Sequence, residues 1–373
     1  MKALFVSNDQ TLLEPGSPAR LRMRAYADAI GTLHVMTRAA RTESSEEGSL
    51  TVHGVAVGKL GLRAFAKRAC ALIEREGIEV VSAQDPFEYG LIAHWATKGT
   101  TAKLHLQVHT DFLSPWFLRD GIMRAPRVSM PLKNRIRRAI ADRVLPSADG
   151  IRVVSARVKD SLVARYGTRI PEPAILPIAV TDPVPEAVPL PPHPFPFALI
   201  TVSRLEPEKR IEDIIDALGR ISDRYPAIGL IIVGEGRERA RLERMVARKK
   251  LAERVLFAGA RADAWGLMRS AQGYIQASAY EGYSRTLIEA ALARTPIITT
   301  DVGVVGEVLV GYEDVLSSPP SDPAQLAVNM VGLIEDVGAR EAMVRSACQK
   351  ATAHIAEYAD LPTLVARDLA RTL

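Results

Sequence analysis

Two glutamates in the second half of the chain have the spacing and setting of a binding or catalytic site. Glu281 and Glu289 lie within residues 274–300, YIQASAYEGYSRTLIEAALARTPIITT, which reads as strand, loop, helix and strand. Glu281 falls in the loop, whereas Glu289 falls inside a helix that is apolar on nearly every face and is therefore expected to be buried. A buried carboxylate must be paired or hydrogen-bonded. The spacing alone leaves open a second interpretation, two unrelated structural glutamates.

The expected helix start between these glutamates could hold an anion. Helical side chains lean toward the N-terminus, so Glu289 can point at the loop that carries Glu281. Ser284 is the expected N-cap, and Pro296 follows the end of the helix. Backbone N–H groups gather at such a start, and this favours a phosphate.

The elements that must position these residues alternate between strand and helix in both halves of the chain. Expected strands fall at 2–7, 33–36, 51–57, 80–82, 104–108 and 151–154, and again at 198–202, 230–233, 255–258, 274–276 and 297–300. The alternation predicts doubly wound parallel sheets, which bind ligands beyond the carboxyl ends of their strands. His109 follows such a strand. A lone histidine is more often structural, and this position keeps a functional role open.

A proline-rich segment separates the two halves. Seven prolines fall between Pro183 and Pro196, and no regular element is expected there. The predicted division is therefore an N-terminal domain over 1–180, a linker over 181–196, a C-terminal domain over 197–355 and a terminal helix over 356–373. A polar stretch at 41–49 is expected to be a surface loop.

Composition narrows the class of protein. The chain has 373 residues, which is more than one typical core, with a net charge of +5 and an ordinary share of hydrophobic residues. No apolar run is long enough to span a bilayer, and the N-terminus lacks a signal-peptide layout. Cys70 and Cys348 have no metal-ligand spacing and fit a reducing, cytoplasmic setting. Aromatic residues are not interleaved with basic ones, so no nucleic-acid partner is expected.

A basic segment at 119–143 suggests a second kind of surface. The expected helix over 132–145 carries an apolar stripe of Ile136, Ile140 and Val144 between many arginines and lysines. Such a helix, beside exposed apolar residues that include Phe117 and Met123, suits an anionic membrane on the inner face of the cell or an acceptor surface. The alternative is a solvated helix that packs by its stripe. The candidate residues are Trp116, Lys133, Arg137 and Arg138.

Several ordered segments of the second half resemble the retaining glycosyltransferases of family 4. The matching segments are VSRLEPEKRIEDIIDAL at 202–218, LIIVGEGRERARLE at 230–243, VLFAG at 255–259, YEGYSRTLIEA at 280–290 and PIITTDVGVVGEVL at 296–309. The first half resembles the same enzymes more loosely, through LLEPGSPARLRMRAYADAI and QVHTDF. The resemblance implies the α/β GT-B fold, with two Rossmann-like domains facing each other across a cleft and a C-terminal helix that crosses back to the first domain.

The resemblance also implies roles for individual residues. Arg204 and Lys209 would bind the donor diphosphate, Glu281 the donor sugar and Glu289 the ribose, and His109 would contact the sugar near the reacting centre. The catalytic candidates are therefore His109, Glu281, Arg204 and Lys209. The candidates for donor binding are Gly16, Gly234, Gly236, Gly259, Gly282, Tyr283, Ser284, Arg285, Thr286, Leu287 and Glu289.

The implied activity is transfer of a sugar from a nucleoside diphosphate sugar to a hydroxyl acceptor, a lipid-linked or cell-envelope glycan. No cofactor or metal is expected, since no two aspartates stand two residues apart as in a D-x-D motif. The alternatives are a nucleotide-sugar-binding protein without transferase activity and a nonhydrolysing nucleotide-sugar epimerase. The chain departs from the family pattern at Ser17, Ser284 and Arg285, and Arg285 is where we expect specificity to differ.

Overall fold

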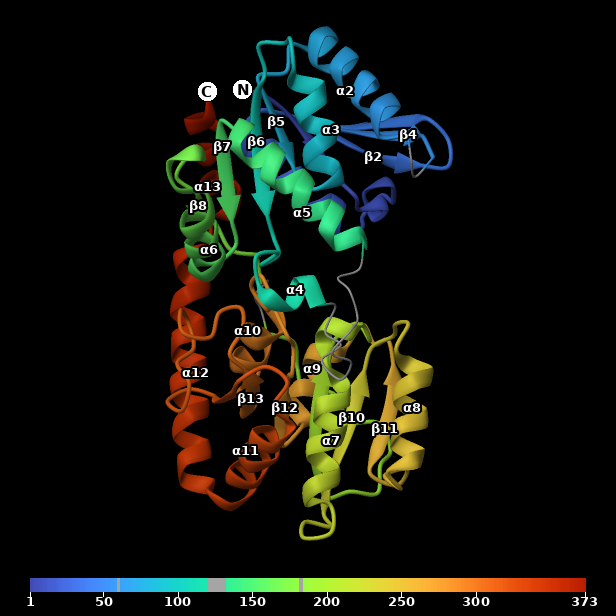
Figure 1. Cartoon of the computed structure of the whole chain (residues 1–373), viewed down its shortest axis with the longest axis vertical. Helices are drawn as coiled ribbons and strands as arrows, with labels where there is room; N and C mark the ends of the chain where they lie inside the picture. The colour runs from blue at the N-terminus through green and yellow to red at the C-terminus, as the bar shows by residue number, and fades with distance from the viewer. Residues whose placement is uncertain (59–60, 120–131, 181–183) are drawn as a thin grey trace. The chain divides into compact units, whose positions relative to one another are not determined.

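The computed structural model describes residues 1–58, 61–119, 132–180 and 184–373. The chain divides into two compact units, each built on its own sheet (Figure 1). The first unit comprises Met1–Phe112, Leu132–Pro177 and Tyr358–Leu373, and the second comprises Leu113–Pro131 and Ile178–Glu357. Both are α/β units on parallel sheets, which confirms the predicted fold class.

The first unit has an eight-stranded sheet in the order β3-β4-β2-β1-β5-β6-β7-β8. Among the strands in the described part of the chain, only β3 runs antiparallel to its neighbour, because it forms a hairpin with β4. The polar stretch predicted as a loop is therefore an edge strand, stabilised by backbone pairing that its composition does not reveal. The strands are β1 (Lys2–Val6), β2 (Thr32–Ala39), β3 (Glu43–Glu47), β4 (Leu50–Ala56), β5 (Val80–Ala83), β6 (Lys103–Val108), β7 (Gly150–Val153) and β8 (Ala174–Ile175).

Helices cover both faces of this sheet. One face carries α1 and the C-terminal helix α13, whose buried residues share a core with β1, β2 and β4. Helix α3 packs against both α2 and α5, and it contacts β5 and β6 (Figure 1). The helices of the unit are α1 (Pro18–Ile30), α2 (Leu62–Glu76), α3 (Glu88–Thr97), α5 (Leu132–Val144), α6 (Ala156–Tyr166) and α13 (Leu361–Thr372).

The second unit has a six-stranded, fully parallel sheet in the order β11-β10-β9-β12-β13-β14. A hydrophobic core joins the sheet to α7, α8 and α11. The elements are β9 (Phe197–Val202), β10 (Ile228–Val233), β11 (Val255–Gly259), β12 (Gly273–Ile275), β13 (Ile297–Thr300), β14 (Leu316–Ser318), α4 (Pro115–Arg119), α7 (Ile211–Ile221), α8 (Arg239–Arg248), α9 (Ala264–Ser270), α10 (Arg285–Leu292), α11 (Pro323–Glu335) and α12 (Val337–Glu357).

The described part of the proline-rich segment is anchored to the second unit. It forms no regular element, but Val188 N donates to the Gly266 carbonyl at 3.1 Å and Ser270 Oγ donates to the Val188 carbonyl at 2.7 Å. Further along, Phe195 is buried against Gly229, where an added Cβ would come within 2.2 Å of the Phe195 ring. This segment therefore packs on α9 and on β10.

Candidate functional site

The carboxylate of Glu281 is held by a cation and a hydroxyl at the carboxyl edge of the second sheet. Its Oε1 pairs with the ammonium of Lys209 and accepts a 2.7 Å hydrogen bond from Ser278 Oγ. The Lys209 and Glu281 side chains are 18% and 14% exposed. Ala279 N donates to the Glu208 carbonyl at 2.8 Å, so backbone pairing also joins the two loops that carry the pair.

The cations before α7 have different partners. Arg210 begins the helix in the left-handed region, at φ +50°, and is buried in a bidentate pair with Asp213 at 2.8 Å. Its role is structural. Arg204 is 73% exposed and makes a 3.3 Å ion pair with Glu208. An exposed guanidinium in a weak surface pair can reach a ligand at small cost.

Three glycines let the loops after β9, β10 and β11 approach closely. A Cβ on Gly234 would lie 1.8 Å from the Ser203 carbonyl oxygen, and one on Gly236 would lie 2.4 Å from the Leu205 oxygen. Gly234 also donates its N–H to the Gly259 carbonyl at 2.8 Å, and Gly259 itself has φ +71°. The loops that follow these three strands are therefore in direct backbone contact at one edge of the sheet.

Ser284 stands at the N-cap of α10, as predicted, but its side chain does not cap the helix. The residue has φ +69°, and its hydroxyl donates to Gln276 Oε1 at 2.9 Å. The prediction of a capping hydroxyl was wrong because Gln276, at the end of β12, binds this hydroxyl and that of Thr286, the latter at 3.1 Å. The hydroxyl of Ser284 thus leaves the backbone N–H groups of the helix start to other partners.

The loop before α10 is supported by the turn that contains Gly303 and by His354 of α12. A Cβ on Gly303 would lie 2.5 Å from the Tyr283 carbonyl oxygen, so the 302–304 turn packs directly on the loop. The buried Tyr283 has its hydroxyl 2.8 Å from Nε2 of His354 on α12, and the two rings stack. The neighbouring Gly282 and Leu287 are also buried. The segment is therefore held in place by both Gly303 and His354.

Glu289 is paired within its own helix. Its Oε1 lies 2.7 Å from Arg285 Nε, and the two side chains are 12% and 47% exposed. Burial raises the pKa of the Glu289 carboxyl, and Arg285 acts in the opposite direction. Trp265 fixes the backbone here by donating its indole N–H to the Glu289 carbonyl at 2.8 Å. Arg285 therefore serves as the counterion of the second glutamate.

In the first unit, Gly16 and His109 lie at loops that follow strands. Gly16 adopts φ +77° with nothing within 4 Å of an added Cβ, so a backbone conformation rather than crowding requires glycine there. His109 has Nε2 3.0 Å from Gln107 Oε1. Burial, reinforced by the charges of Arg152 and Arg22, lowers the pKa of His109 to about 3. His109 is therefore a neutral hydrogen-bonding group at physiological pH.

The predicted membrane or acceptor surface is only partly as expected. Arg137 is engaged with Glu88 at 2.9 Å, while Lys133 is exposed and Arg138 half-buried. The predicted stripe of α5 is wrong at Ile136, which is 51% exposed, because the helix buries Asn134 and Ala141 instead.

The aromatic part of that surface belongs to the second unit. Trp116 is half-buried in α4, and Phe117 was wrongly expected to be exposed, since its ring packs edge-on against Tyr280. Met123 and the rest of 120–131 lie outside the described residues.

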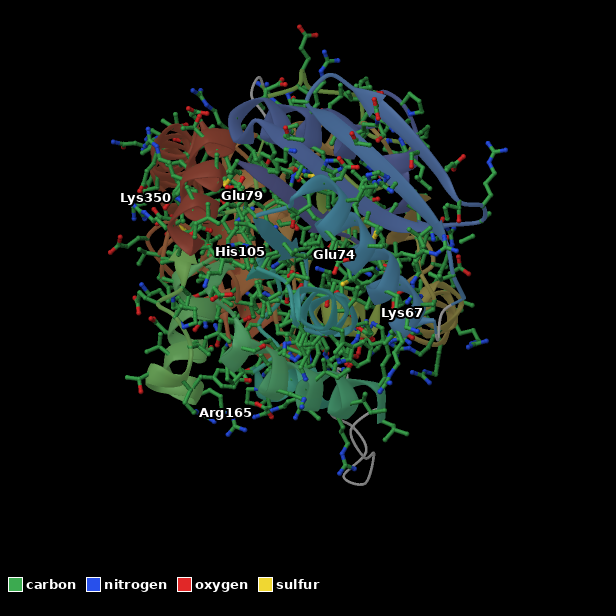
Figure 2. The ribbon with its side chains drawn as sticks, turned by 90° about the horizontal axis from the view of Figure 1, so that it is seen from above. Lys67, Glu74, Glu79, His105, Arg165 and Lys350 are labelled. Atoms are coloured by element: carbon green, nitrogen blue, oxygen red, sulfur yellow. The ribbon has the colours of Figure 1, made fainter. Side chains whose placement is uncertain are left out.

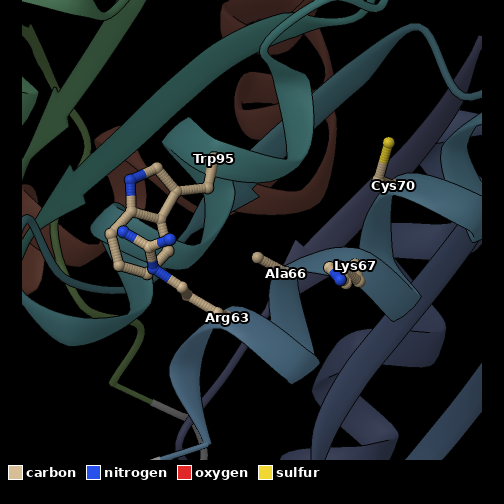
Figure 3. Close-up of a pocket in the computed structure, with 5 residues that line it drawn as sticks. All are labelled: Arg63, Ala66, Lys67, Cys70 and Trp95. Atoms are coloured by element: carbon tan, nitrogen blue, oxygen red, sulfur yellow. The ribbon is translucent and has the colours of Figure 1, made fainter.

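A separate pocket lies between α2 and α3. Its volume is about 350 Å³, and the residues that line it are Arg63, Ala66, Lys67, Cys70 and Trp95 (Figure 3). The Arg63 guanidinium lies 5.3 Å from the centre of a Trp95 ring. None of the predicted site residues lines this pocket.

The described residues contain neither a cluster of metal ligands nor a helix that could span a membrane. Over residues 1–58, 61–119, 132–180 and 184–373, no cluster of three or more His, Cys, Asp or Glu side chains could hold a metal ion. Within the same ranges, no helix combines the length and apolar character needed to cross a bilayer.

Comparison with known proteins adds to this geometry. The family model described as "Glycosyl transferases group 1" matches residues 192–350, and "Glycosyl transferase 4-like domain" matches residues 19–179. A curated relative, the glycogen synthase of Mycobacterium tuberculosis, is 26% identical over 216 residues, which cover 57% of this chain and 52% of the relative. The chain thus spans about half the length of the first curated relatives that it matches.

Solved structures share the fold over the whole chain. The sucrose-phosphate synthase of Thermosynechococcus elongatus superposes with a TM-score of 0.78 at 17% identity, covering 100% of this chain and 98% of its own. Anabaena HepE in complex with UDP-glucose superposes with a TM-score of 0.72 at 18% identity, covering both chains fully. At these identities the likeness establishes the fold alone.

Proposed function

We propose that this chain, which belongs to the group 1 glycosyltransferases, moves a sugar from a nucleoside diphosphate sugar to a hydroxyl acceptor. One observation carries the proposal: the nearly buried Glu281 carboxylate is held by Lys209 and Ser278 beside the start of α10. A fixed carboxylate accepts hydrogen bonds from sugar hydroxyls, while the adjacent ammonium and helix start attract a diphosphate.

The charges of the second unit suit the departure of a diphosphate. When the bond between the anomeric carbon and the phosphate oxygen breaks, negative charge grows on the leaving group. Arg204 is exposed and can turn toward that charge, and Lys209 is already positioned by its pairing with Glu281. Preorganised cations of this kind stabilise a transition state more than the ground state. Glu289, with Arg285 as its counterion, would accept from the ribose hydroxyls.

We infer a retaining, metal-independent reaction from the same arrangement. The acceptor oxygen bonds to the anomeric carbon on the face from which the diphosphate leaves, and its proton passes to the departing phosphate oxygen. Side-chain cations then supply the charge stabilisation that a metal ion gives in other transferases. The stereochemistry is tested by NMR of the product anomer, and the metal independence by turnover in excess chelator.

A donor with uridine is the first to test, since similar structures are described as complexes with UDP or UDP-glucose. The experiment is a thermal-shift screen of uridine, guanosine and adenosine diphosphate sugars, followed by a transfer assay with the stabilising donor. A bound ligand raises the melting temperature by mass action, so one base should stand out. Stabilisation by none of the three bases, with no transfer, would sink the proposal.

The same assay separates the alternatives. A nucleotide-sugar-binding protein without transferase activity would be stabilised by the donor and yet give no product with any hydroxyl acceptor. An epimerase would release an epimer or free sugar in the absence of acceptor. The family membership and the intact charged residues favour transfer over both.

We propose a lipid-linked or cell-envelope acceptor, with the protein acting from the cytoplasm at an anionic membrane. The exposed face of α5 motivates this, since Leu132 and Ile136 are 70% and 51% exposed beside exposed Lys133, Arg135 and Arg143. An interfacial helix combines apolar and basic side chains in this way.

Co-sedimentation with vesicles of phosphatidylcholine and phosphatidylglycerol tests the membrane proposal. The double variant Leu132→Ser/Ile136→Ser should lose binding, whereas Val163→Ser, which changes a 40% exposed residue on α6, should keep it. Binding that is equal in both variants, or absent from the unmodified protein, would rule out α5 as the contact.

A further inference from the structure

Polar side chains occupy one face of β6, in the interior of the first sheet. His105 and Gln107 alternate with Leu104, Leu106 and Val108, and His109 continues the same face just beyond the strand. In a strand, alternate residues share a face. Here that face is buried, with His105 1% and Gln107 3% exposed, so its polar groups need partners inside the fold.

The partners form one continuous chain of hydrogen bonds. Asp368 Oδ2 on α13 lies 3.0 Å from His105 Nε2, and His105 Nδ1 lies 2.8 Å from Ser82 Oγ on the adjacent strand β5. Ser82 Oγ accepts from Gln107 Nε2 at 2.9 Å, and Gln107 Oε1 lies 3.0 Å from His109 Nε2. His105 is labelled in Figure 2. The chain thus links the C-terminal helix to the histidine at the strand end.

Each link sets the direction of the next. A carboxylate only accepts, so His105 donates from Nε2 and, when neutral, accepts at Nδ1. The Ser82 hydroxyl donates to that nitrogen, which leaves its oxygen to accept from the Gln107 amide N–H. The amide oxygen of Gln107 then accepts from Nε2–H of His109. Neutral His109 is thereby left with its lone pair on Nδ1.

We propose that Asp368 is a positioning residue that holds His109 in its Nε2-protonated tautomer, so that Nδ1 accepts a hydrogen bond from a hydroxyl of a sugar substrate. The part about the sugar rests on the proposed function. The part about the tautomer rests only on contacts within the first unit. A carboxylate that orients a histidine in this way is a recurrent device in catalytic sites.

The opposite direction of the hydrogen-bond chain requires an additional proton on His105. If His105 carried a positive charge, it would donate to Ser82, the hydroxyl would donate to Gln107, and the turned amide would donate to His109 Nε2. His109 would then be protonated at Nδ1. The charged groups near this face are Asp368, Arg152 and Arg22. Arg152 is buried on β7 beside Gln107. The two directions differ in which nitrogen of His109 carries the proton, and this difference can be measured.

The test is the nitrogen NMR spectrum of His109 in the full chain, with its signals assigned through a His109→Gln variant. The unmodified protein should show a protonated Nε2 and an unprotonated Nδ1. Asp368→Asn keeps the shape of the side chain but lets its amide donate, so the signals should change to the other tautomer or to a mixture. Asp360→Asn is the matched control, since Asp360 caps α13 through Thr363 N at 3.2 Å and asparagine caps equally well.

Rescue separates positioning from a structural role. In the double variant Asp368→Asn/Gln107→Glu, the new carboxylate accepts from both Ser82 and His109 and should restore the Nε2-protonated form. Should Asp368→Asn fail to fold, Ser82→Ala breaks the same chain in its middle and should give the same change. In transfer assays, Asp368→Asn should lower kcat by ~10-fold to 100-fold with little effect on KM.

Two results would overturn the proposal. One is a protonated Nδ1 on His109 in the unmodified protein, which means that the chain runs in reverse. The other is a His109 spectrum that neither Asp368→Asn nor Ser82→Ala changes. The expected NMR result together with no transfer from any nucleotide sugar would instead uphold the tautomer and refute the proposed function.

Discussion

Candidate side chains lie at the carboxyl ends of strands in both units, but those of the second unit are charged and His109 of the first unit is neutral. In the second unit the side chains are charged and paired, Lys209 with Glu281 and Arg285 with Glu289. In the first unit His109 is neutral and is held by a chain of buried hydrogen bonds. A charged side chain that is already paired can be turned toward a ligand at a lower desolvation cost, whereas a neutral side chain in a buried chain of hydrogen bonds has a fixed orientation and carries no charge of its own. The difference suggests one unit for binding charge and the other for orienting a neutral hydroxyl.

The sharpest way to break this comparison is to remove the carboxylate of Glu281. Glu281→Ala should reduce transfer by ~1,000-fold or more, because both the proposed contact with the sugar and the positioning of Lys209 are lost. Product formation at saturating donor is the measurement. Glu253→Ala, at an exposed residue of the same unit, is the control and should leave transfer unchanged. Full turnover in Glu281→Ala would contradict the assignment.

The next largest effect concerns a charge with little structural role. Arg204→Ala should lower kcat by ~100-fold while the melting temperature stays within about 1 °C, since the side chain is 73% exposed and surface ion pairs contribute little stability. Arg224→Ala, at 76% exposure and also ion-paired on the surface, is the matched control. Equal activities of the two variants would contradict a role of Arg204 at the diphosphate.

A smaller effect should appear when the counterion of Glu289 is removed. Burial raises the pKa of Glu289 and Arg285 opposes this, so Arg285→Ala should raise that pKa further. The ionised carboxylate then needs a higher pH, and the acid limb of the pH profile of kcat/KM should move upward, with a loss of ~10-fold at pH 6. Arg285→Lys keeps the charge and should restore most of the activity at this pH. An acid limb that stays in place in Arg285→Ala would argue against the pairing.

The smallest effect tests the neutral state of His109 through the stability of the protein. The pKa of His109 is about 3 in the folded protein and 6.5 for an unperturbed histidine, so the unfolded chain takes up the proton first as pH falls. The stability contributed by neutral His109 is therefore complete above pH 6.5 and is lost progressively toward pH 3, by on the order of 1 kcal/mol at pH 5 after allowance for partial exposure.

Chemical denaturation at pH 7 and pH 5 measures this loss. His109→Gln should lose less stability between these two values than the unmodified protein, because glutamine does not titrate. An identical loss in both proteins would show that His109 is not held neutral, and the contrast between the two units would then fail.

Much of the fold and part of the candidate site can be inferred from the local sequence. The strand and helix periods predicted two α/β units, because each period depends on near neighbours along the chain. The glutamates at 281 and 289 were singled out by their spacing, whereas the glycines at 234 and 236 were identified through the family resemblance. Even the pair of Arg285 and Glu289 was within reach, since residues four apart on a helix are neighbours.

Other features have no signal in the local sequence. The hydroxyl of Ser284 binds Gln276 and leaves the helix uncapped, and Tyr283 is held by His354, which lies 71 residues further along the chain. The edge strand β3 looked like a loop because its stability comes from pairing with β4 rather than from its own composition. Each of these depends on which segments the topology brings together.

By itself, then, the sequence determined the repeating elements, because their periods depend on near neighbours, and the glycines and charged residues of the second unit, through its resemblance to a family. Only the tertiary structure decided which groups those residues meet. Asp368 lies 263 residues from His105, and no periodic pattern connects them. Their contact arises because α13 covers the polar face of β6, and buried polar groups must find their partners wherever the packed elements place them.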